Sequence, residues 1–215
     1  MATALIETET DLAAALAALA AQDPRLVEVV AASGPVTLRR RPGGFEGLVR
    51  IVMAQQLSTA SADAIWTRLR AAYEPFDHTA LLRARTAKLQ RVGLSAPKIR
   101  TVKAIARAVA DGEIAFEALA GMPADEAHAV MTKVHGVGPW TTDIYLLFCL
   151  GHGDAWPAGD LALQEAARIA LALEARPTAK QMVTLGEAWR PWRGVAAHLL
   201  WAYYRVLKRR DPVPA

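Results

Sequence analysis

Three aspartates in the second half of the chain, Asp143, Asp154 and Asp160, are the carboxylates best placed to take part in chemistry. Asp160 follows Gly159 and stands at the start of an expected helix. An ionised carboxylate can stabilise positive charge that develops on a substrate and can orient an attacking water. By position alone, however, an aspartate at a helix start is a helix N-cap. We expect Asp143 to face solvent on its helix and Asp154 to shape the loop that precedes Asp160.

A glycine-rich turn, Gly136-Val137-Gly138, separates two expected helices and is suited to bind an anion. Glycine permits a tight turn and a close approach of the main chain, and Pro139 suits the first position of the next helix. The amides of such a turn, with the positive end of the helix dipole, can hold a phosphate without any side chain. A bare Gly-x-Gly would favour an ordinary packing hairpin. The longer run Gly-Val-Gly-Pro-Trp-Thr-Thr, which ends at Thr142, is much more specific.

The elements that must position these residues are expected to be helices, because apolar residues recur at helical spacing and strand-like alternation is nearly absent. We expect helices over Thr10–Ala21, Phe45–Ala54, Pro123–Lys133, Trp140–Leu150, Lys180–Trp189 and Gly194–Lys208, and others that follow Pro24, Ser58, Ser95 and Asp160. The helix after Ser95 carries Arg100, Lys103 and Arg107 on its outer face, a stripe typical of a solvated surface. The fold class is therefore all-α.

Composition narrows the classes of protein further. The chain has 215 residues, 53% of them hydrophobic, which fits one medium domain or two tightly joined lobes. A net charge of +4 suits a polyanionic partner. Cys149 is the single cysteine, so a disulfide framework and a four-cysteine iron–sulfur cluster are excluded. The five histidines form no metal-binding pattern, and we expect no metal and no cofactor.

The sequence gives no sign of a membrane segment or of export. No apolar stretch approaches the roughly 18 residues of a membrane span. Glu7, Glu9 and Asp11 precede the first alanine-rich run, where a signal peptide would carry basic residues. We therefore expect a cytoplasmic protein.

Five segments, in their order and spacing, carry a resemblance to a known family. They are residues 48–58, Gly93-Leu94-Ser95 with Lys98, residues 136–142, residues 154–161, and residues 189–201. On these segments the chain resembles the helix-hairpin-helix DNA glycosylase superfamily, and in particular the 3-methyladenine DNA glycosylase II (AlkA-like) family. The family usually has Leu-Pro before the hairpin glycine, where this chain has Val134-His135.

The resemblance implies a single glycosylase domain over residues 1–215 with an all-α, two-lobed helix-hairpin-helix fold. One lobe, about residues 45–154, would be a helical barrel that carries the hairpin. Residues 1–44 and 155–215 would form the second lobe. No counterpart of the added β domain of larger members is expected, and no iron–sulfur cluster.

The resemblance also implies the residues that act on the base. Asp160 is the catalytic aspartate, and Trp140 and Trp201 lie at the base pocket. Bifunctional relatives carry a lysine on the second hairpin helix that forms a Schiff base with the sugar, and Trp140 stands at that position here. Without that amine the enzyme should stop at an abasic site.

The DNA contacts implied by the resemblance lie in two segments. Gln56 or Leu57 would fill the gap that an extruded base leaves, although core packing is an alternative for Leu57. Ser58 would lie in the minor groove. The expected phosphate-binding hairpin residues are His135, Gly136, Val137, Gly138 and Thr141.

The implied function is that of a monofunctional DNA glycosylase of base excision repair. It would hydrolyse the N-glycosidic bond of alkylated purines, such as 3-methyladenine and 7-methylguanine, in double-stranded DNA. We expect a monomer that associates with a bacterial-type nucleoid through DNA binding. Two alternatives stay open, namely a non-catalytic helix-hairpin-helix DNA-binding protein and a glycosylase for other damaged or mismatched bases.

Overall fold

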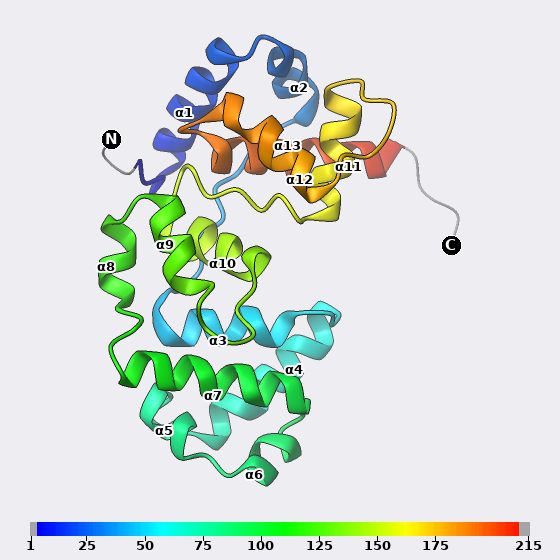
Figure 1. The fold of residues 1–215 in the computed structure, drawn as a ribbon. Helices are drawn as coiled ribbons and strands as arrows, with labels where there is room; N and C mark the ends of the chain where they lie inside the picture. The colour runs from blue at the N-terminus through cyan, green and yellow to red at the C-terminus, as the bar shows by residue number, and fades with distance from the viewer. Residues whose placement is uncertain (1–3, 211–215) are drawn as a thin grey trace. The chain divides into compact units, whose positions relative to one another are not determined.

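The computed structural model describes residues 4–210 and divides the chain into two compact units (Figure 1). The central unit is Arg41–Leu150. The terminal unit is drawn from both ends of the chain, Met1–Arg40 and Gly151–Ala215. Within the described residues the regular elements are helical, apart from an isolated bridge between Leu5 and His152, so the all-α prediction is confirmed. None of the described helices is long and apolar enough to cross a membrane.

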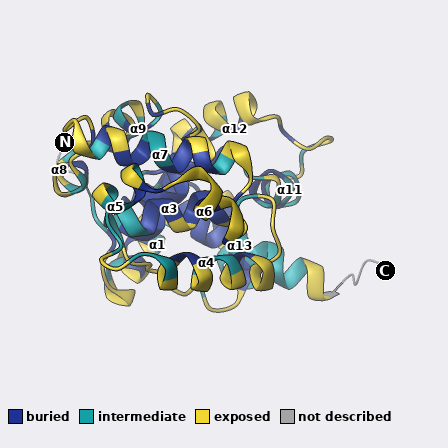
Figure 2. Ribbon diagram, turned by 90° about the horizontal axis from the view of Figure 1, so that it is seen from below, coloured by how far each residue is buried: buried dark blue, intermediate teal, exposed yellow. Residues whose placement is uncertain are grey.

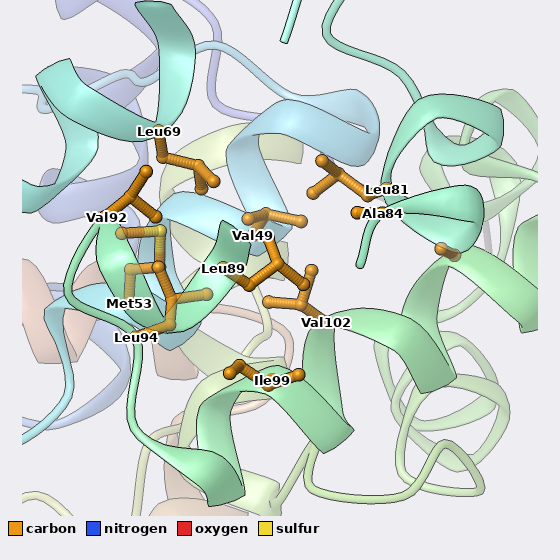
Figure 3. Close-up of a cluster of buried hydrophobic side chains, with 11 residues drawn as sticks. Val49, Met53, Leu69, Leu81, Ala84, Leu89, Val92, Leu94, Ile99 and Val102 are labelled. Carbon is orange, nitrogen blue, oxygen red and sulfur yellow. The ribbon is translucent and has the colours of Figure 1, made fainter. Parts of the chain in front are cut away.

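The central unit is built around α3 and α7. Its elements are α3 Gly44–Ala54, α4 Thr59–Ala72, α5 His78–Arg83, α6 Thr86–Arg91, α7 Ala96–Ala110, α8 Phe116–Gly121, α9 Ala124–Met131 and α10 Pro139–Tyr145, which a π-helical turn extends over Leu146–Leu150. Helix α7 packs against α3 and α5. Figure 2 shows α3 largely buried, and Figure 3 shows Val49 and Met53 of α3 packed with Ile99 and Val102 of α7. Burial of this apolar surface stabilises the unit.

Three short helices of the central unit, α5, α6 and α8, were not expected from the sequence. Each is six residues long, which is less than two turns and too short for a helical repeat of apolar residues to be visible. Each presents one buried leucine to the core, namely Leu81, Leu89 and Leu119. Packing of these leucines, more than helix propensity, accounts for such short helices.

In the central unit, basic side chains from other helices bind the carbonyl groups at the ends of several helices. Lys88 Nζ donates to Ala72 O at the end of α4 (2.6 Å), and Lys103 Nζ donates to Ala84 O after α5 (2.8 Å). Arg68 Nε donates to Val92 O after α6 (3.0 Å). The last carbonyls of a helix lack partners within the helix, so these cations stabilise its end. The interpretation of Lys103 as part of a solvated stripe is therefore wrong, because its amine is held by another helix end.

The terminal unit packs around the last helix. Its elements are α1 Glu9–Gln22, α2 Arg25–Ser33, α11 Leu161–Ala170, α12 Ala179–Gly186, a 3-10 turn at Glu187–Trp189 and α13 Arg193–Arg210. Helix α13 packs against α2 and α11, as Figure 1 shows. Trp156 and Trp189 are buried and meet edge to face at 5.5 Å, a geometry that aromatic rings in a protein core prefer. Asp23, between α1 and α2, accepts a hydrogen bond from Trp189 Nε1 (2.9 Å).

Candidate functional site

The loop that leads to Asp160 is tied down by a buried ion pair. Arg193 is only 5% exposed, and its Nε and Nη2 donate to the two oxygens of Asp154 at 2.8 Å each. Arg190 Nη1 donates to Asp154 Oδ2 at 2.9 Å. Such a bidentate pair fixes both distance and orientation. Asp154 therefore shapes the loop, as its position suggested, but its pairing with Arg193, 39 residues away, was not predicted from the sequence.

Two further hydrogen bonds hold the loop from inside the terminal unit. Trp156 Nε1 donates to Met182 O (2.8 Å), and the buried amide of Gln164 donates from Nε2 to Ala158 O (3.0 Å). Because Gln164 lies on α11, the loop and the helix that begins after Asp160 are joined directly. The main chain of Asp160 is thus positioned before its side chain makes any contact.

Asp160 is the N-cap of α11 and also the carboxylate that the indole of Trp201 contacts. Its Oδ1 accepts hydrogen bonds from the amides of Ala162 (3.0 Å) and Leu163 (3.1 Å) at the positive end of the helix dipole. Trp201 Nε1 donates to the same oxygen at 3.2 Å. The side chain is neither fully buried nor fully exposed. The capping interpretation is correct. The cap also holds the carboxylate in one orientation, which is compatible with a chemical role for the same side chain.

His198 supports Trp201 on α13. The two rings meet edge to face, with centroids 6.4 Å apart and an interplanar angle of 86°. Burial, with the nearby cations Arg39 and Arg205, lowers the pKa of His198 to about 4. The imidazole is therefore neutral at pH 7. It adds no positive charge beside Trp201 and Asp160.

The glycine-rich hairpin lies in the central unit between α9 and α10. Gly136 has φ +83°, and a Cβ there would overlap the side chain of Thr101, so glycine is required. Gly138 is the N-cap of α10, makes no side-chain cap and has open space where a Cβ would lie. The side chains of Val137 and Thr141 are buried, whereas His135 is exposed. Val137 and Thr141 can therefore meet a ligand only through their main chain.

Asp143, one turn after the hairpin, does not face solvent as the sequence suggested. It is 8% exposed, and its Oδ1 lies 3.8 Å from Nε2 of His128 on α9. The pair links the two helices that flank the hairpin. The expectation failed because α9 covers a helix face that local sequence alone leaves open.

Gln56 and Leu57 lie in the short turn between α3 and α4. Gln56 is exposed with φ +57°, a left-handed conformation that residues with a Cβ seldom adopt. Leu57 is 39% exposed, so core packing is the wrong interpretation for this leucine. Ser58 is exposed and caps α4, since its hydroxyl accepts from Ser61 N at 3.3 Å. The turn thus presents an amide and an apolar side chain to the outside.

The aromatic residues expected near a base divide between the two units. Trp201 is half-buried in the terminal unit. Trp140 belongs to α10 in the central unit and is 36% exposed. Tyr145, at the end of α10, is fully buried, and its hydroxyl accepts a hydrogen bond from Gly44 N (2.8 Å). Within residues 4–210, no group of three or more His, Cys, Asp or Glu side chains is arranged to hold a metal ion.

The match to a known protein family covers the part of the chain that holds the hairpin and Asp160. The family model for the HhH-GPD superfamily of base excision DNA repair proteins matches residues 49–191, which include both features. The chain belongs to this superfamily, and the resemblance noted in the sequence is confirmed.

Two relatives of the chain are named as 3-methyladenine DNA glycosylases. The chain is 30% identical to DNA-3-methyladenine glycosylase 1 of Schizosaccharomyces pombe, over 88% of this chain and 85% of that protein. The S. pombe 3-methyladenine DNA glycosylase Mag1, solved in complex with abasic DNA, superposes with a TM-score of 0.75 at 28% identity, over 87% of this chain and 95% of that one.

A bacterial relative is longer. A probable bifunctional transcriptional activator/DNA repair enzyme AlkA of Mycobacterium tuberculosis is 34% identical over 92% of this chain. The present chain spans 40% of the length of that protein.

Proposed function

We propose that the protein is a monofunctional DNA glycosylase that hydrolyses the N-glycosidic bond of alkylated purines in duplex DNA and leaves an abasic site. The observation that carries the proposal is Asp160. Two helix amides and Trp201 hold one of its oxygens, in a chain that belongs to a base excision repair superfamily. The relatives named as 3-methyladenine glycosylases support the choice of alkylated purines.

The chemistry asked of Asp160 is modest for such bases. Cleavage of the N-glycosidic bond builds positive charge on the deoxyribose, and an ionised carboxylate stabilises that charge and orients a water. A purine alkylated at N3 or N7 is already cationic and departs as a neutral molecule. Asp160 then has to stabilise only the sugar. A neutral base departs as an anion and requires a proton or strong donors as well.

Aromatic side chains supply the selectivity in this proposal. A cation over an aromatic face gains about 0.5–2 kcal/mol, so Trp201 and Trp140 would favour a cationic purine over a neutral one. The neutral imidazole of His198 beside Trp201 avoids repulsion of that cation. We therefore expect 3-methyladenine, and next 7-methylguanine, to leave faster than hypoxanthine or uracil.

DNA binding is assigned to the central unit. The amides of the hairpin and of the first turn of α10 would hold a phosphate, since Gly138 offers no side-chain cap to that turn. The exposed turn would fill the gap left by the extruded base with Gln56 or Leu57, and Ser58 would follow in the minor groove. We further propose that the protein acts as a monomer on a bacterial-type nucleoid.

The test is to incubate purified protein with alkylated genomic DNA and to identify the released bases by mass spectrometry. Release of 3-methyladenine with single-turnover rates above those for hypoxanthine and uracil is the expected result. Tight DNA binding without any release would favour a non-catalytic DNA-binding protein. Equal release of uracil or hypoxanthine would contradict the proposed selectivity, even with Asp160 confirmed as catalytic.

A further inference from the structure

Lys98 differs from the other basic side chains that end helices in the central unit. Its Nζ donates to two carbonyls, Met53 O at 2.7 Å and Gln55 O at 2.9 Å, where Lys88 and Lys103 each donate to one. Met53 lies in the last turn of α3, and Gln55 follows the helix directly. A helix leaves its last carbonyls without partners, and here one ammonium group satisfies two of the oxygens at the end of α3.

The residue after Gln55 is held in an uncommon conformation. Gln56 has φ +57°, which persists for a residue with a Cβ only when the surrounding structure imposes it. Gln55, the residue before it, makes two hydrogen bonds to other helices. Its carbonyl accepts from Lys98, and its side-chain Nε2 donates to Thr141 Oγ1 of α10 at 2.6 Å. One residue is thus anchored at both its main chain and its side chain.

The anchor is partly shielded from solvent. Lys98 is partly buried, and this burial lowers the pKa of its ammonium group. The two carbonyls offset the cost of placing the charge there. Immediately beyond the anchor, Gln56 and Leu57 are exposed. The structure therefore ties down the base of the turn and leaves its tip accessible.

We infer that Lys98 is a positioning residue that holds the turn after α3 so that Gln56 and Leu57 enter the gap in the duplex. The inference rests on the proposed function, because it assumes that this turn inserts into DNA. It assigns to Lys98 a role beyond stabilising a helix end, and it predicts a loss that Lys103, on the same helix α7, does not share.

The experiment uses a duplex with a tetrahydrofuran abasic-site analogue opposite 2-aminopurine, whose fluorescence reports unstacking when the turn fills the gap. Measured at saturating protein, the amplitude is independent of affinity. We expect wild-type protein to change the fluorescence and Lys98→Met to reduce that change at least threefold. Lys98→Arg should restore most of it, since a cationic donor is kept. Lys103→Met, which removes a single-carbonyl cap from the same helix, should match the wild type.

The possible outcomes separate this inference from the proposed function. Equal amplitudes for Lys98→Met and wild type, an equal loss in Lys103→Met, or no change with wild-type protein would overturn the role of Lys98. Should Lys98→Met fail to fold, Lys98→Gln, which replaces the ammonium by a neutral amide, is measured with the same expected loss. Wild-type protein that shows the fluorescence change but releases no alkylated base would refute the glycosylase proposal and leave the positioning role standing.

A second readout follows the reaction itself. Lys98→Met should lower the single-turnover rate for an alkylated purine in a matched pair by at least tenfold. The loss should shrink when the same base faces an abasic site, because a weakened pair needs less help to leave the stack. A loss of equal size on both duplexes would point to general destabilisation and would count against the inference.

Discussion

At the scale of single residues, one carboxylate combines a structural and a proposed chemical role. The two amides of α11 that cap onto Asp160 Oδ1 also place it at the positive end of a helix dipole. Trp201 donates to the same oxygen from a helix that begins more than 30 residues later in the chain. The cap and the indole keep the carboxylate in a single orientation. That orientation is what electrostatic stabilisation of a developing cation requires.

Asp160→Asn should separate the two roles. Asparagine is as good an N-cap as aspartate, so the melting temperature should stay close to that of the wild type. Removal of the charge should slow base release by at least about a hundredfold, while DNA affinity persists. Single-turnover release and a binding titration on the same alkylated duplex measure both. Near-normal turnover by the variant would refute the catalytic assignment.

Trp201→Phe should reveal the contribution of the indole donor. The ring is kept, but the hydrogen bond from Nε1 to Asp160 is lost. Hydrogen bonds to charged groups contribute about 1.5–3 kcal/mol, so we expect release to slow by roughly tenfold or more. Trp192→Phe, elsewhere in the same unit, is the control. An unchanged rate in Trp201→Phe would mean that the two helix amides position Asp160 without Trp201.

At the scale of elements, the hairpin shows two glycines with different requirements. Gly136 needs its positive φ and has no room for a Cβ beside Thr101. Gly138 has an ordinary φ of −84° and open space around it. The first glycine is demanded by the fold. The second is free to serve a ligand that approaches the start of α10.

Gly138→Asp therefore tests the hairpin without disturbing the fold. The new carboxylate would repel a phosphate, and we expect at least a tenfold weaker affinity for duplexes of any sequence. The dependence of log affinity on log salt should flatten by about 0.9 for one lost phosphate contact. Gly138→Ala is the matched control for size alone. Wild-type affinity in the aspartate variant would remove the hairpin from the interface.

At the scale of the whole molecule, the proposed reaction on DNA should yield one product, an abasic site. By resemblance to the family, Trp140 would stand where a lyase of this superfamily carries its lysine. A tryptophan forms no imine with the sugar. Borohydride should consequently trap no protein–DNA adduct, and strand breaks should appear only after alkali or heat. A trapped adduct on denaturing gels would show that another amine supplies lyase chemistry.

Stability against acid is a second whole-molecule property, and His198 contributes to it. The folded pKa is about 4, below the 6.5 of the unfolded chain. Between these values the unfolded state binds more protons, so folding loses stability as the pH falls. The contribution of His198 to the free energy of unfolding is fully present above pH 6.5. Roughly 3 kcal/mol of that free energy is lost by pH 4.

Urea unfolding of wild type and His198→Gln between pH 4 and pH 7.5 measures that contribution. The difference in unfolding free energy between the two proteins should change by roughly 3 kcal/mol over this range, to the disadvantage of the wild type at low pH. Asp23 also has a lowered pKa, but its value of about 2 lies below the pH range of this measurement. Parallel pH profiles of the two proteins would show that His198 is not buried in the neutral form.

The sequence by itself determined the features that depend on near neighbours along the chain. Helical spacing predicted an all-helical protein, and Ser58 and Asp160 cap the helices that were expected to follow them. The positive φ of Gly136 belongs to the tight turn between two helices, whereas its close approach to Thr101 depends on packing. Local features of this kind can be predicted from the sequence because the hydrogen bonds of a helix and of its caps join residues no more than four apart.

Only the tertiary structure decided the fate of side chains that meet distant partners. It buried Asp143 under His128, exposed Leu57 and used Lys103 to end another helix. It brought Trp201 to Asp160 across 41 residues. A solvated stripe and a stripe that packs have the same local spacing, so burial is set by whichever helix packs across that face. The family resemblance carried by the sequence therefore singled out the candidate carboxylate, whereas packing brought Trp201 to it.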